Sequence, residues 1–437
     1  MDHTKLAALG GPKVRTRPFP RRRTMGDAEK KAVLEVMDSD VLSAFIGAAG
    51  SMFLGGPKVR EFEKRWADRY GFAHAISVSS WSAGLMIAYG AVGIEPGDEV
   101  ICPPYTMSAS AASAFYYGGI PVFADIDPVT FCIDPKSIEK RITPRTKAIM
   151  VVHLFGRAAD MAAIMAIAKK HNLRVIEDAA QAPGVYSNGV PVGAIGDVGG
   201  FSLNYHKHIH TGEGGVLVTQ NPDIAMRCQW IRNHGENAID GDDPPANISN
   251  AFGGNFRLTE LQCAIGIAQL DRLEGYLKSR RRLADVLREG LKGAPGITAQ
   301  PAPADPREQA YYGYPIMIDE KKLGISRDAY VKAVVAELPV GDDAESVPIY
   351  GGYVKPLYLN RIYQERTAIG SKHFPWSVNA GVTYDYSKGL CPVAEQMHES
   401  GLMLTPLIRE PMTEEDIADF AKAMVKVAEG ASTLAKS

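Results

Sequence analysis

The segment KAIMVVHLFGRAADMAAIMAIAKKHNLRVIED, residues 147–178, decides the fold of this 437-residue chain. An apolar run at 147–155 predicts a strand, the pattern over 159–171 predicts a helix, and RVIED at 174–178 predicts a second strand. Strands that alternate with helices in this way build a largely parallel sheet with helices on both faces. In such sheets ligands bind beyond the C-terminal ends of the strands, so the terminal Asp178 is a candidate site residue.

The same alternation extends in both directions from this segment, over about residues 57–220. Helical patterns at 82–93 and 107–117 lie between further short apolar runs that predict strands. These runs are AISVS (75–79), DEVICPP (98–104), PVFADID (121–127), VGGFSL (198–203) and GVLVT (215–219). The sequence therefore predicts an α/β fold with a mostly parallel, seven-stranded sheet between helices.

The chain is longer than one domain core usually holds, so we expect two domains. A long helical pattern begins near Leu258, and the Pro- and Ala-rich stretch 297–310 ends it. This helix should link the large domain to a smaller C-terminal α+β domain, whose last helix spans 413–430 with Thr413 as its N-cap. The expected division is an N-terminal arm at 1–26, a large ligand-binding domain at 27–270 and a small domain at 271–437.

Residues 340–390 are rich in tyrosine and show few clear periods. We interpret them as long ordered loops that wall a substrate pocket, with a plain surface elaboration as the alternative. The tyrosines are Tyr350, Tyr353, Tyr358, Tyr363, Tyr384 and Tyr386.

Composition places the chain among ordinary globular proteins, with 46% hydrophobic and 22% charged residues. A net charge of −2 gives no reason to expect nucleic acid or an anionic membrane as a partner. No apolar run approaches the roughly 20 residues that a membrane-spanning helix needs. The N-terminus lacks the apolar core of a secretory signal, so we expect a cytoplasmic protein, with Arg21, Arg22 and Arg23 in a solvated basic arm.

Several other classes of site are not favoured by the sequence. The five cysteines lie far apart without a CxxC pair, which argues against a disulfide framework or a zinc site; Cys102 and Cys263 should be small buried side chains. No G-x-G-x-x-G turn opens a helix after an early strand, and no G-x₄-G-K-[ST] loop is present. Nucleotide-dependent dehydrogenases and ATPases are therefore not indicated.

A lysine follows Asp178 by 29 residues, within FSLNYHKHIHTGEGGVLVT (201–219). A strand ends at Ser202, an irregular stretch presents Lys207, and GEGG turns the chain back into a strand. A lysine that forms a Schiff base must be positioned and partly desolvated, and a pyridoxal ring needs a carboxylate such as Asp178 to keep its nitrogen protonated. Taken singly, a solvated lysine and an acidic helix N-cap are the plainer interpretations.

A third feature is SVSSWSAGL (77–85), where a strand runs into a helix through small polar residues. Free backbone N–H groups at the helix N-terminus, including that of Ala83, together with the hydroxyl of Ser80 or Ser82, would hold a phosphate. Helix capping alone explains these serines equally well.

These segments together resemble the DegT/DnrJ/StrS family of sugar aminotransferases, which are fold-type I enzymes that use pyridoxal 5′-phosphate (PLP). The likeness covers about residues 27–430, and the combination of EDAAQA with FS-x₄-K-x₄-GEGG is its most specific part. The segments that carry it are GPKVREFEKRWADRYG (56–71), GIEPGDEVICPPYT (93–106), GGIPVFADIDPVTFCIDP (118–135), ITPRTKAIMVVHLFG (142–156), EDAAQAPG (177–184), FSLNYHKHIHTGEGG (201–215), RNHG (232–235) and GNFRLTELQCAIGIAQL (254–270).

The resemblance implies a role for each matching residue. Lys207 would form the Schiff base with PLP and shuttle the proton at the reacting carbon, and Asp178 would pair with the pyridine nitrogen. Gln181 would hydrogen-bond the phenolic oxygen of the cofactor. Ser202, Ser82 and Ala83 would contact its phosphate. Asn255 matches a position that reaches the phosphate in the neighbouring subunit, which implies a homodimer.

The sequence departs from the family pattern at two positions. Trp81 stands in the phosphate-binding turn where the family has glycine. Met107 stands where the family stacks an aromatic ring on the cofactor; its thioether can pack on a ring face, or Tyr105 can substitute for it. Met107 is included among the expected cofactor contacts, whereas Trp81 is not.

Three alternatives stay open from the sequence. His206, His208 and His210 alternate and would share one face of a strand at metal-ligand reach, although shaping of the pocket is the preferred interpretation. Family members with histidine in place of the lysine are dehydratases, so a PLP-dependent dehydratase or another lyase is the main rival. A non-catalytic regulatory homologue is the third reading.

The sequence-based conclusion is a PLP-dependent aminotransferase that works by ping-pong transamination. Glutamate or glutamine would give its amino group to the cofactor, and a keto sugar, usually nucleotide-linked, or a keto cyclitol would accept it. The segments LGGPKVRTRPFP (9–20) and GGYVKPLY (351–358) look like those of family members that act on keto-inositols.

Overall fold

A computed structural model describes residues 5–239, 247–339 and 347–435. Its central element is a seven-stranded sheet with the strand order β1-β9-β8-β5-β4-β2-β3. Every strand of this sheet coincides with one of the seven predicted runs. The strands are β1 (His74–Val78), β2 (Glu99–Cys102), β3 (Ile120–Phe123), β4 (Thr146–Val152), β5 (Arg174–Asp178), β8 (Val198–Ser202) and β9 (Gly215–Thr219).

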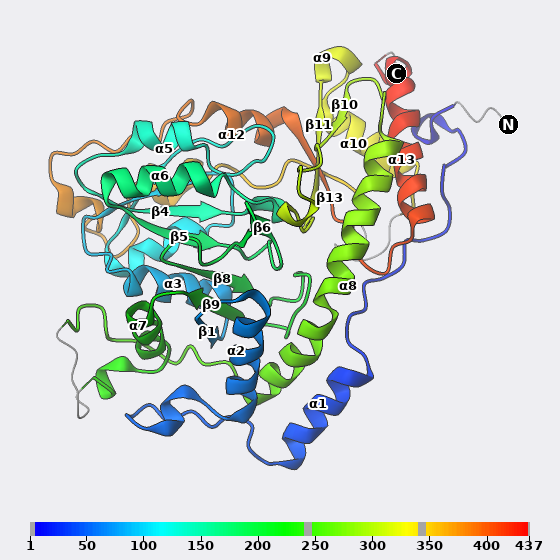
Figure 1. Ribbon diagram of the computed structural model, residues 1–437. Coiled ribbons are helices and arrows are strands. Elements are labelled where there is room, and N and C mark those ends of the chain that lie inside the picture. The colour runs from blue at the N-terminus through cyan, green and yellow to red at the C-terminus, as the bar shows by residue number, and fades with distance from the viewer. Residues whose placement is uncertain (1–4, 240–246, 340–346, 436–437) are drawn as a thin grey trace.

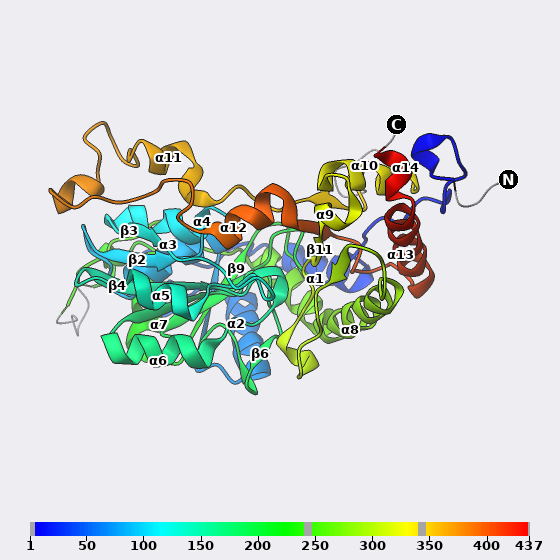
Figure 2. The same ribbon diagram turned by 90° about the horizontal axis from the view of Figure 1, so that it is seen from above.

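The sheet is mostly parallel, as predicted. Only β9 runs against its neighbours, because it pairs antiparallel with both β1 and β8, whereas the other four pairings are parallel. The strands are buried on both faces, as their apolar composition requires. Helices cover both sides, with α3 (Trp81–Ala91) on one side and α6 (Met161–His171) on the other (Figure 2). The other helices and strands of this part are α4 (Ala109–Ala112), α5 (Pro135–Arg141), α7 (Pro222–Arg232), β6 (Tyr186–Ser187) and β7 (Val190–Pro191).

A single long helix, α8 (Glu260–Gly290), joins this sheet to the C-terminal part of the chain (Figure 1). Thr259 caps it in a capping box with Gln262, so the start predicted near Leu258 is confirmed. The helix packs against α1 (Asp27–Asp38) and α2 (Pro57–Tyr70) on the large-sheet side and against α13 (Glu414–Glu429) on the other.

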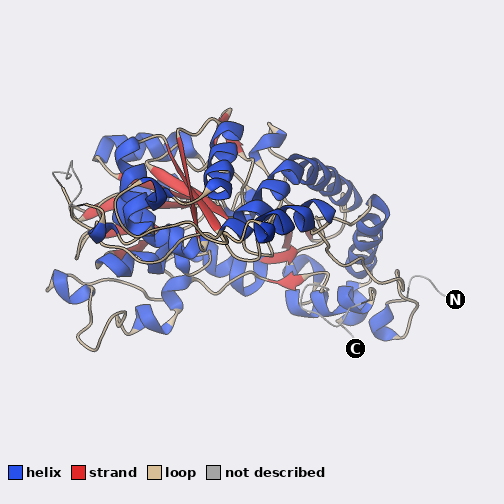
Figure 3. Cartoon of the chain, turned by 90° about the horizontal axis from the view of Figure 1, so that it is seen from below, coloured by secondary structure: helices blue, strands red, loops and turns tan. Residues whose placement is uncertain are grey.

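The C-terminal part is the smaller α+β unit that the sequence predicts. Its antiparallel sheet has the order β10-β11-β13-β12 and a core separate from that of the large sheet. Thr413 and Asp416 form the predicted capping box of α13. The elements of this part are β10 (Ile297–Ala299), β11 (Tyr314–Ile318), α9 (Glu320–Leu323), α10 (Arg327–Ala336), β12 (Tyr350–Gly351), β13 (Leu402–Thr405) and α14 (Ala431–Leu434). Helices and strands both appear in this unit in the secondary-structure colouring of Figure 3. The expected boundary at residue 270 falls inside α8, so the division into domains is kept as a proposal.

The tyrosine-rich segment divides between two environments. Residues 340–346 of the predicted loops lie outside the described part of the chain. Tyr358, Tyr363, Tyr384 and Tyr386 are buried in the large-sheet core together with Trp376, whereas Tyr350 and Tyr353 line hollows near the sheet edge. The segment carries two short helices, α11 (Arg361–Gln364) and α12 (Pro392–Gln396). The first part of the segment therefore lines a pocket, four of its tyrosines anchor it in the core, and most residues between 361 and 390 are exposed, as a surface elaboration would have them.

The N-terminal arm is bound to both parts of the protein. Leu6 lies in the core of the C-terminal unit, and the Arg15 guanidinium is 2.7 Å from the Asp416 carboxylate of α13. Further along, Arg22 donates hydrogen bonds to the backbone carbonyls of Tyr205 and Lys207. The expectation of a solvated basic arm is therefore wrong for Arg22, because its guanidinium bonds the loop that carries the candidate lysine.

Two further expectations can be compared with the structure. All five cysteines are free and buried, as predicted for Cys102 and Cys263. Within the described ranges, no helix combines the length and the apolar character needed to cross a membrane.

Two glycines of α8 give a matched test of this packing. A Cβ added to Gly266 would lie 2.8 Å from the ring of Phe62 on α2, whereas one added to Gly275 meets nothing within 4 Å. We expect Gly266→Ala to destabilise the protein by about 1–3 kcal/mol through overpacking. Gly275→Ala should stabilise it by about 0.5–1 kcal/mol, because alanine loses less backbone entropy in a helix.

Thermal denaturation of the two variants measures both effects, with a lowered midpoint for Gly266→Ala and a raised one for Gly275→Ala. Equal shifts in the same direction would show that α2 and α8 do not pack as described.

Candidate active site

A cavity of about 390 Å³ lies beyond the C-terminal ends of β5 and β8. This volume is in the range of pockets that hold a cofactor or a small substrate. Most of the sequence-predicted site residues meet on its wall, namely Ser82, Met107, Asp178, Gln181, Ser202 and Lys207. Strand topology explains the meeting, since β5 and β8 are parallel neighbours and both end at this edge of the sheet.

Asp178 is the most constrained of these residues. Its side chain is buried, and its carboxylate accepts three hydrogen bonds from neutral donors. Oδ1 accepts from the indole Nε1 of Trp81 at 2.8 Å and from the Ala180 amide at 3.1 Å, and Oδ2 accepts from Ser110 Oγ at 2.7 Å. A carboxylate has about four acceptor sites, so one is left for a donor in the cavity.

Trp81 lines the cavity and donates to this carboxylate. Trp81 is the first residue of α3. Its ring packs against Gly200 of β8, where a Cβ would lie only 2.4 Å from the ring. A Cβ on Gly84 would be 2.6 Å from the same ring. From the sequence, Trp81 is only a departure from the family pattern, and its contact with Asp178 is not predicted. Gly84 and Gly200 leave the space that the indole ring occupies, and they are the only trace of this packing in the sequence.

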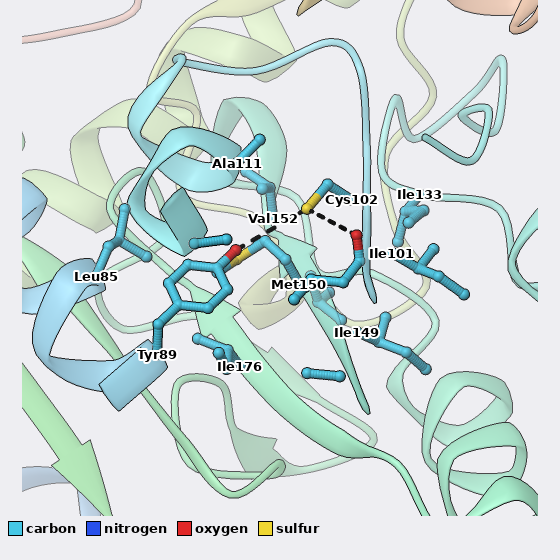
Figure 4. Close-up of a cluster of buried hydrophobic side chains, with 14 of the residues drawn as sticks. Leu85, Tyr89, Ile101, Cys102, Ala111, Ile133, Ile149, Met150, Val152 and Ile176 are labelled. Atoms are coloured by element: carbon cyan, nitrogen blue, oxygen red, sulfur yellow. Dashed lines mark hydrogen bonds between the residues drawn. The ribbon is translucent and has the colours of Figure 1, made fainter. Parts of the chain in front are cut away.

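A second layer of contacts fixes Ser110. Its backbone carbonyl accepts a hydrogen bond from the Tyr89 hydroxyl at 2.6 Å, and its Oγ lies 3.1 Å from Thr106 Oγ1. Figure 4 shows Tyr89 among buried aliphatic side chains, close to Cys102. Burial raises the pKa of the Tyr89 hydroxyl well above its ordinary value, so it stays protonated and remains a donor at neutral pH.

Lys207 lies in the loop between β8 and β9 and is half-buried. Its Nζ is 4.4 Å from the centroid of the Tyr312 ring, a cation–π distance, while its backbone carbonyl is bonded by Arg22. Gly212, at φ +84°, adopts the left-handed conformation that lets the chain turn back toward β9. The loop thus places the Lys207 amine at the cavity, and the hydrogen bonds from Arg22 of the N-terminal arm fix its backbone.

Gln181 is oriented by two partners. Its Oε1 accepts from the Phe155 amide at 2.7 Å, and its Nε2 donates to the Tyr353 hydroxyl at 3.1 Å. Burial raises the pKa of Tyr353, so this hydroxyl is neutral at physiological pH. Because a side-chain amide has two N–H donors, Gln181 can still donate one hydrogen bond to a ligand in the cavity.

The predicted phosphate turn has a partly different arrangement from the one expected. Ser80 is the N-cap of α3, and its Oγ accepts from the Ala83 amide at 3.1 Å. The amide of Ala83 is therefore already bonded, and Ala83 lines a neighbouring hollow with Ser79 and Phe256 rather than the Lys207 cavity. Ser82 lines both hollows.

The remaining candidates are Met107, Tyr105 and Asn255, and of these Met107 lines the cavity. Met107 lines the cavity but is 58% exposed, so it leaves one side of the site open in this single chain. Tyr105 is fully buried beneath Tyr353, whose backbone amide donates to the Tyr105 hydroxyl, so Tyr105 does not substitute for the expected stacking ring. Asn255 is exposed, bridges to Asn233, and does not line the cavity of its own chain.

The three histidines around Lys207 point into different surroundings. His208 is buried with Nε2 2.9 Å from the Ala310 carbonyl, and burial lowers its pKa well below the ordinary value. His210 Nε2 is 2.7 Å from Thr24 Oγ1, and His206 lines the cavity. Among the described residues, no cluster of histidine, cysteine or acidic side chains could hold a metal ion. The metal-binding alternative is therefore not supported there.

Comparison with known proteins gives consistent matches over the whole fold. The sequence profile described as the DegT/DnrJ/EryC1/StrS aminotransferase family matches residues 35–381. The chain is 34% identical over 441 residues to L-glutamine:2-deoxy-scyllo-inosose aminotransferase of Streptomyces lividus, with 97% of each chain covered. It is 39% identical over 305 residues to GDP-perosamine synthase of Caulobacter vibrioides, covering 70% of this chain and 78% of the synthase. The crystal structure of DesI in the presence of its TDP-sugar product superposes with a TM-score of 0.78 at 29% identity, covering 99% of this chain and 98% of DesI.

The Trp81–Asp178 contact can be tested with a pair of tryptophan substitutions. Trp81→Phe removes one of the three donors to a buried carboxylate, a loss of about 1.5–3 kcal/mol, and leaves Asp178 held only by the Ala180 amide and Ser110. We expect the dissociation constant for added PLP to rise at least about tenfold, since 1.4 kcal/mol is a factor of ten. Fluorescence titration or equilibrium dialysis measures it.

Trp66→Phe is the matched control. Trp66 is fully buried in the same part of the protein, but its Nε1 has no hydrogen-bond partner among the described residues. Its substitution should leave the PLP affinity within about twofold. If both variants weakened PLP equally, the effect would come from packing and not from the hydrogen bond to Asp178.

Proposed function

Because the chain belongs to the DegT/DnrJ/EryC1/StrS aminotransferase family and is a PLP-dependent aminotransferase, we propose that it moves an amino group from glutamate or glutamine to a keto sugar or keto cyclitol. The observation that carries this proposal is that Lys207 and Asp178 line one cavity at the C-terminal edge of the sheet. An amine and a fixed carboxylate are the two groups that this chemistry requires of the protein.

The residues on the cavity wall fit the cofactor. Asp178 keeps one acceptor site for the protonated ring nitrogen, because only three of about four sites are used. Its three donors are neutral, so they do not cancel its charge. Gln181 has a donor left for the phenolic oxygen, and Ser82 and Ser202 offer hydroxyls for the phosphate. When bound, PLP supplies a ring that accepts electrons and a carbon that carries the amino group.

We assign Lys207 two tasks in succession. Its amine holds the cofactor covalently before substrate arrives, and once released it moves the proton at the substrate carbon that loses or gains the amino group. The half-buried setting beside the Tyr312 ring limits the water around this amine. Donor and acceptor use the same cavity in turn, which makes the reaction ping-pong.

A lysine in this position favours transamination over the dehydratase alternative. The family's dehydratases carry histidine there, and here the neighbouring His208 is buried against the Ala310 carbonyl and lies outside the cavity wall. His206 does line the cavity, but beside Lys207 and not in its place.

The acceptor is proposed from the relatives and from two segments that reach the site. The curated relatives named above act on 2-deoxy-scyllo-inosose or form GDP-perosamine, so both cyclitols and nucleotide-linked sugars are candidates. The arm segment 9–20 leads into Arg22, which bonds the Lys207 loop, and the segment 351–358 contributes Tyr353 to the cavity. Both segments resemble those of family members that act on keto-inositols, which favours a cyclitol as the acceptor.

We also propose that the enzyme is a cytoplasmic homodimer in which Asn255 reaches the partner's cofactor phosphate. Asn255 is exposed and turned away from the cavity of its own chain, as this arrangement needs. Several large apolar side chains near the start of the chain are exposed and are available for contact with a second subunit. They are Leu34, Met37, Val41, Leu42, Ile46 and Met52.

The experiment that tests the function is an absorbance titration of the purified protein. With PLP bound, a visible band should appear that shifts to the near-ultraviolet when glutamate or glutamine is added. Lys207→Ala should abolish the band, while Lys292→Ala, at an exposed lysine of a surface ion pair, should leave it unchanged.

A protein that stays colourless with added PLP would overturn the cofactor site. A band that depends on Lys207 but does not respond to any amino donor would favour the lyase alternative.

A further inference from the structure

The loop that carries Lys207 is long and depends on contacts from outside it. It spans residues 203–214, between β8 and β9, whereas connections between neighbouring antiparallel strands usually have about two to five residues. Its ends are joined by hydrogen bonds from the Leu203 amide to the Gly214 carbonyl and from the Thr211 amide to the Leu203 carbonyl. The middle of the loop lies beyond these bonds, so its position depends on partners from other parts of the chain.

The N-terminal arm supplies several of these partners. Arg22 donates hydrogen bonds to the carbonyls of Tyr205 and Lys207. Two residues further along the arm, Thr24 Oγ1 lies 2.7 Å from Nε2 of His210, which follows Lys207 by three residues. The arm therefore contacts the loop before, at and after Lys207.

The contact between Thr24 and His210 has a defined direction. The Gly212 amide donates to His210 Nδ1 at 3.3 Å, so this nitrogen accepts, and the proton of the neutral imidazole is on Nε2. Nε2 is therefore the donor, and the Thr24 hydroxyl oxygen is the acceptor. Because Gly212 is the residue at which the chain turns back toward β9, the imidazole connects the arm to the turn that closes the loop.

Thr24 is itself fixed on α8. It is only 6% exposed, and its carbonyl accepts from Gln269 Nε2 at 3.0 Å and from Arg272 Nη1 at 2.8 Å. Both donors belong to α8, and Gln269 is fully buried. Gln269 Oε1 also accepts from the His210 amide at 3.4 Å. The long helix therefore holds the arm and the loop together at one point.

The other end of the arm is anchored in the C-terminal unit, from which the arm runs along α8 to α1 (Figure 1). The buried guanidinium of Arg15 is 2.7 Å from the buried carboxylate of Asp416. The buried Glu337 carboxylate accepts from the Ala7 amide at 2.7 Å and lies 2.9 Å from Lys426 Nζ. Separation of buried charge pairs is costly, so the arm stays docked and its far end is a fixed support for the loop.

We propose that Thr24 and His210 are positioning residues for Lys207, because their hydrogen bond fixes the loop from which the amine moves the proton at the substrate carbon. The inference rests on the proposed aminotransferase function. Neither side chain lines the Lys207 cavity, so both act through the loop and not by contact with substrate. Proton transfer requires the amine within hydrogen-bond reach of its target, and a displacement of about 1 Å can slow such a step about a hundredfold.

The test follows the visible band of the full-length, PLP-loaded enzyme after mixing with increasing concentrations of L-glutamate or L-glutamine. Thr24→Val removes the acceptor hydroxyl and keeps the shape of the side chain. We expect the limiting rate of band loss to fall at least about tenfold, because the amine is displaced. The donor concentration at half-saturation should stay within about twofold of wild type, since Thr24 does not contact the donor. Thr24→Ser keeps the hydroxyl and should restore most of the rate.

Thr219→Val is the matched control. Thr219 is also buried, and its hydroxyl donates to the Asp197 carbonyl at the end of β9 that lies away from the Lys207 loop. This variant should react like wild type. Hydrogen exchange of the PLP-loaded enzyme without donor, measured by mass spectrometry, gives a readout that is independent of activity. The amides of residues 203–214 should exchange faster in Thr24→Val and at the wild-type rate in Thr219→Val.

His210→Phe removes the same hydrogen bond from the side of the loop and covers the case in which Thr24→Val does not fold. The double variant should be no slower than the slower single variant, because both changes remove one interaction.

Wild-type rate and wild-type loop exchange in Thr24→Val would overturn the proposal. A weaker apparent affinity for the donor with an unchanged limiting rate, or a Thr24→Ser variant as slow as Thr24→Val, would overturn it as well. A wild-type enzyme without a PLP band, or with a band that no donor changes, would refute the proposed function and this inference with it. A wild type that reacts, beside variants that react equally fast, would refute the positioning role alone.

Discussion

The site depends on the fixed carboxylate of Asp178 at the end of β5. A buried charge is costly unless it is bonded, and here the Trp81 indole, the Ala180 amide and Ser110 satisfy it without neutralising it. Each donor belongs to a different element around the cavity, so α3, the β5 loop and α4 are tied to one another through this group. The parallel neighbour β8 then brings Lys207 to the same edge. The geometry of the cofactor pocket follows from these constraints.

The fold and the centre of the site could be predicted because their signals are local. Each strand of the large sheet is a short apolar run bounded by turn residues, and Asp178 and Ser202 are the last residues of their strands. In a parallel sheet, ligands bind beyond the C-terminal ends of the strands. A carboxylate at the end of one strand and a lysine in the loop after a neighbouring strand can therefore be assigned to one cavity from the sequence.

The remaining features depend on contacts between distant parts of the chain. Trp81 and Asp178 are 97 residues apart, and nothing near Trp81 shows that its indole bonds a carboxylate. Arg22 donates a hydrogen bond to a loop 185 residues further along the chain. Because this contact is not visible in the sequence, the arm is expected from sequence to be solvated. Arg280 lies on α8, where periodicity alone gives no reason for burial of a guanidinium. The sequence does not distinguish the environments of the tyrosines in this segment. Tyr353 lines the site, whereas Tyr358 is buried in the core.

The proposed function depends on the assignment of Lys207 as the residue that holds the cofactor opposite Asp178. Reduction of the PLP-loaded enzyme with borohydride, followed by proteolysis and mass spectrometry of the peptides, tests this directly. If this assignment is right, the mass of the reduced cofactor is found on Lys207, in a peptide from the loop between β8 and β9. Cofactor mass on a different lysine, or on none in a protein that binds PLP, would contradict it.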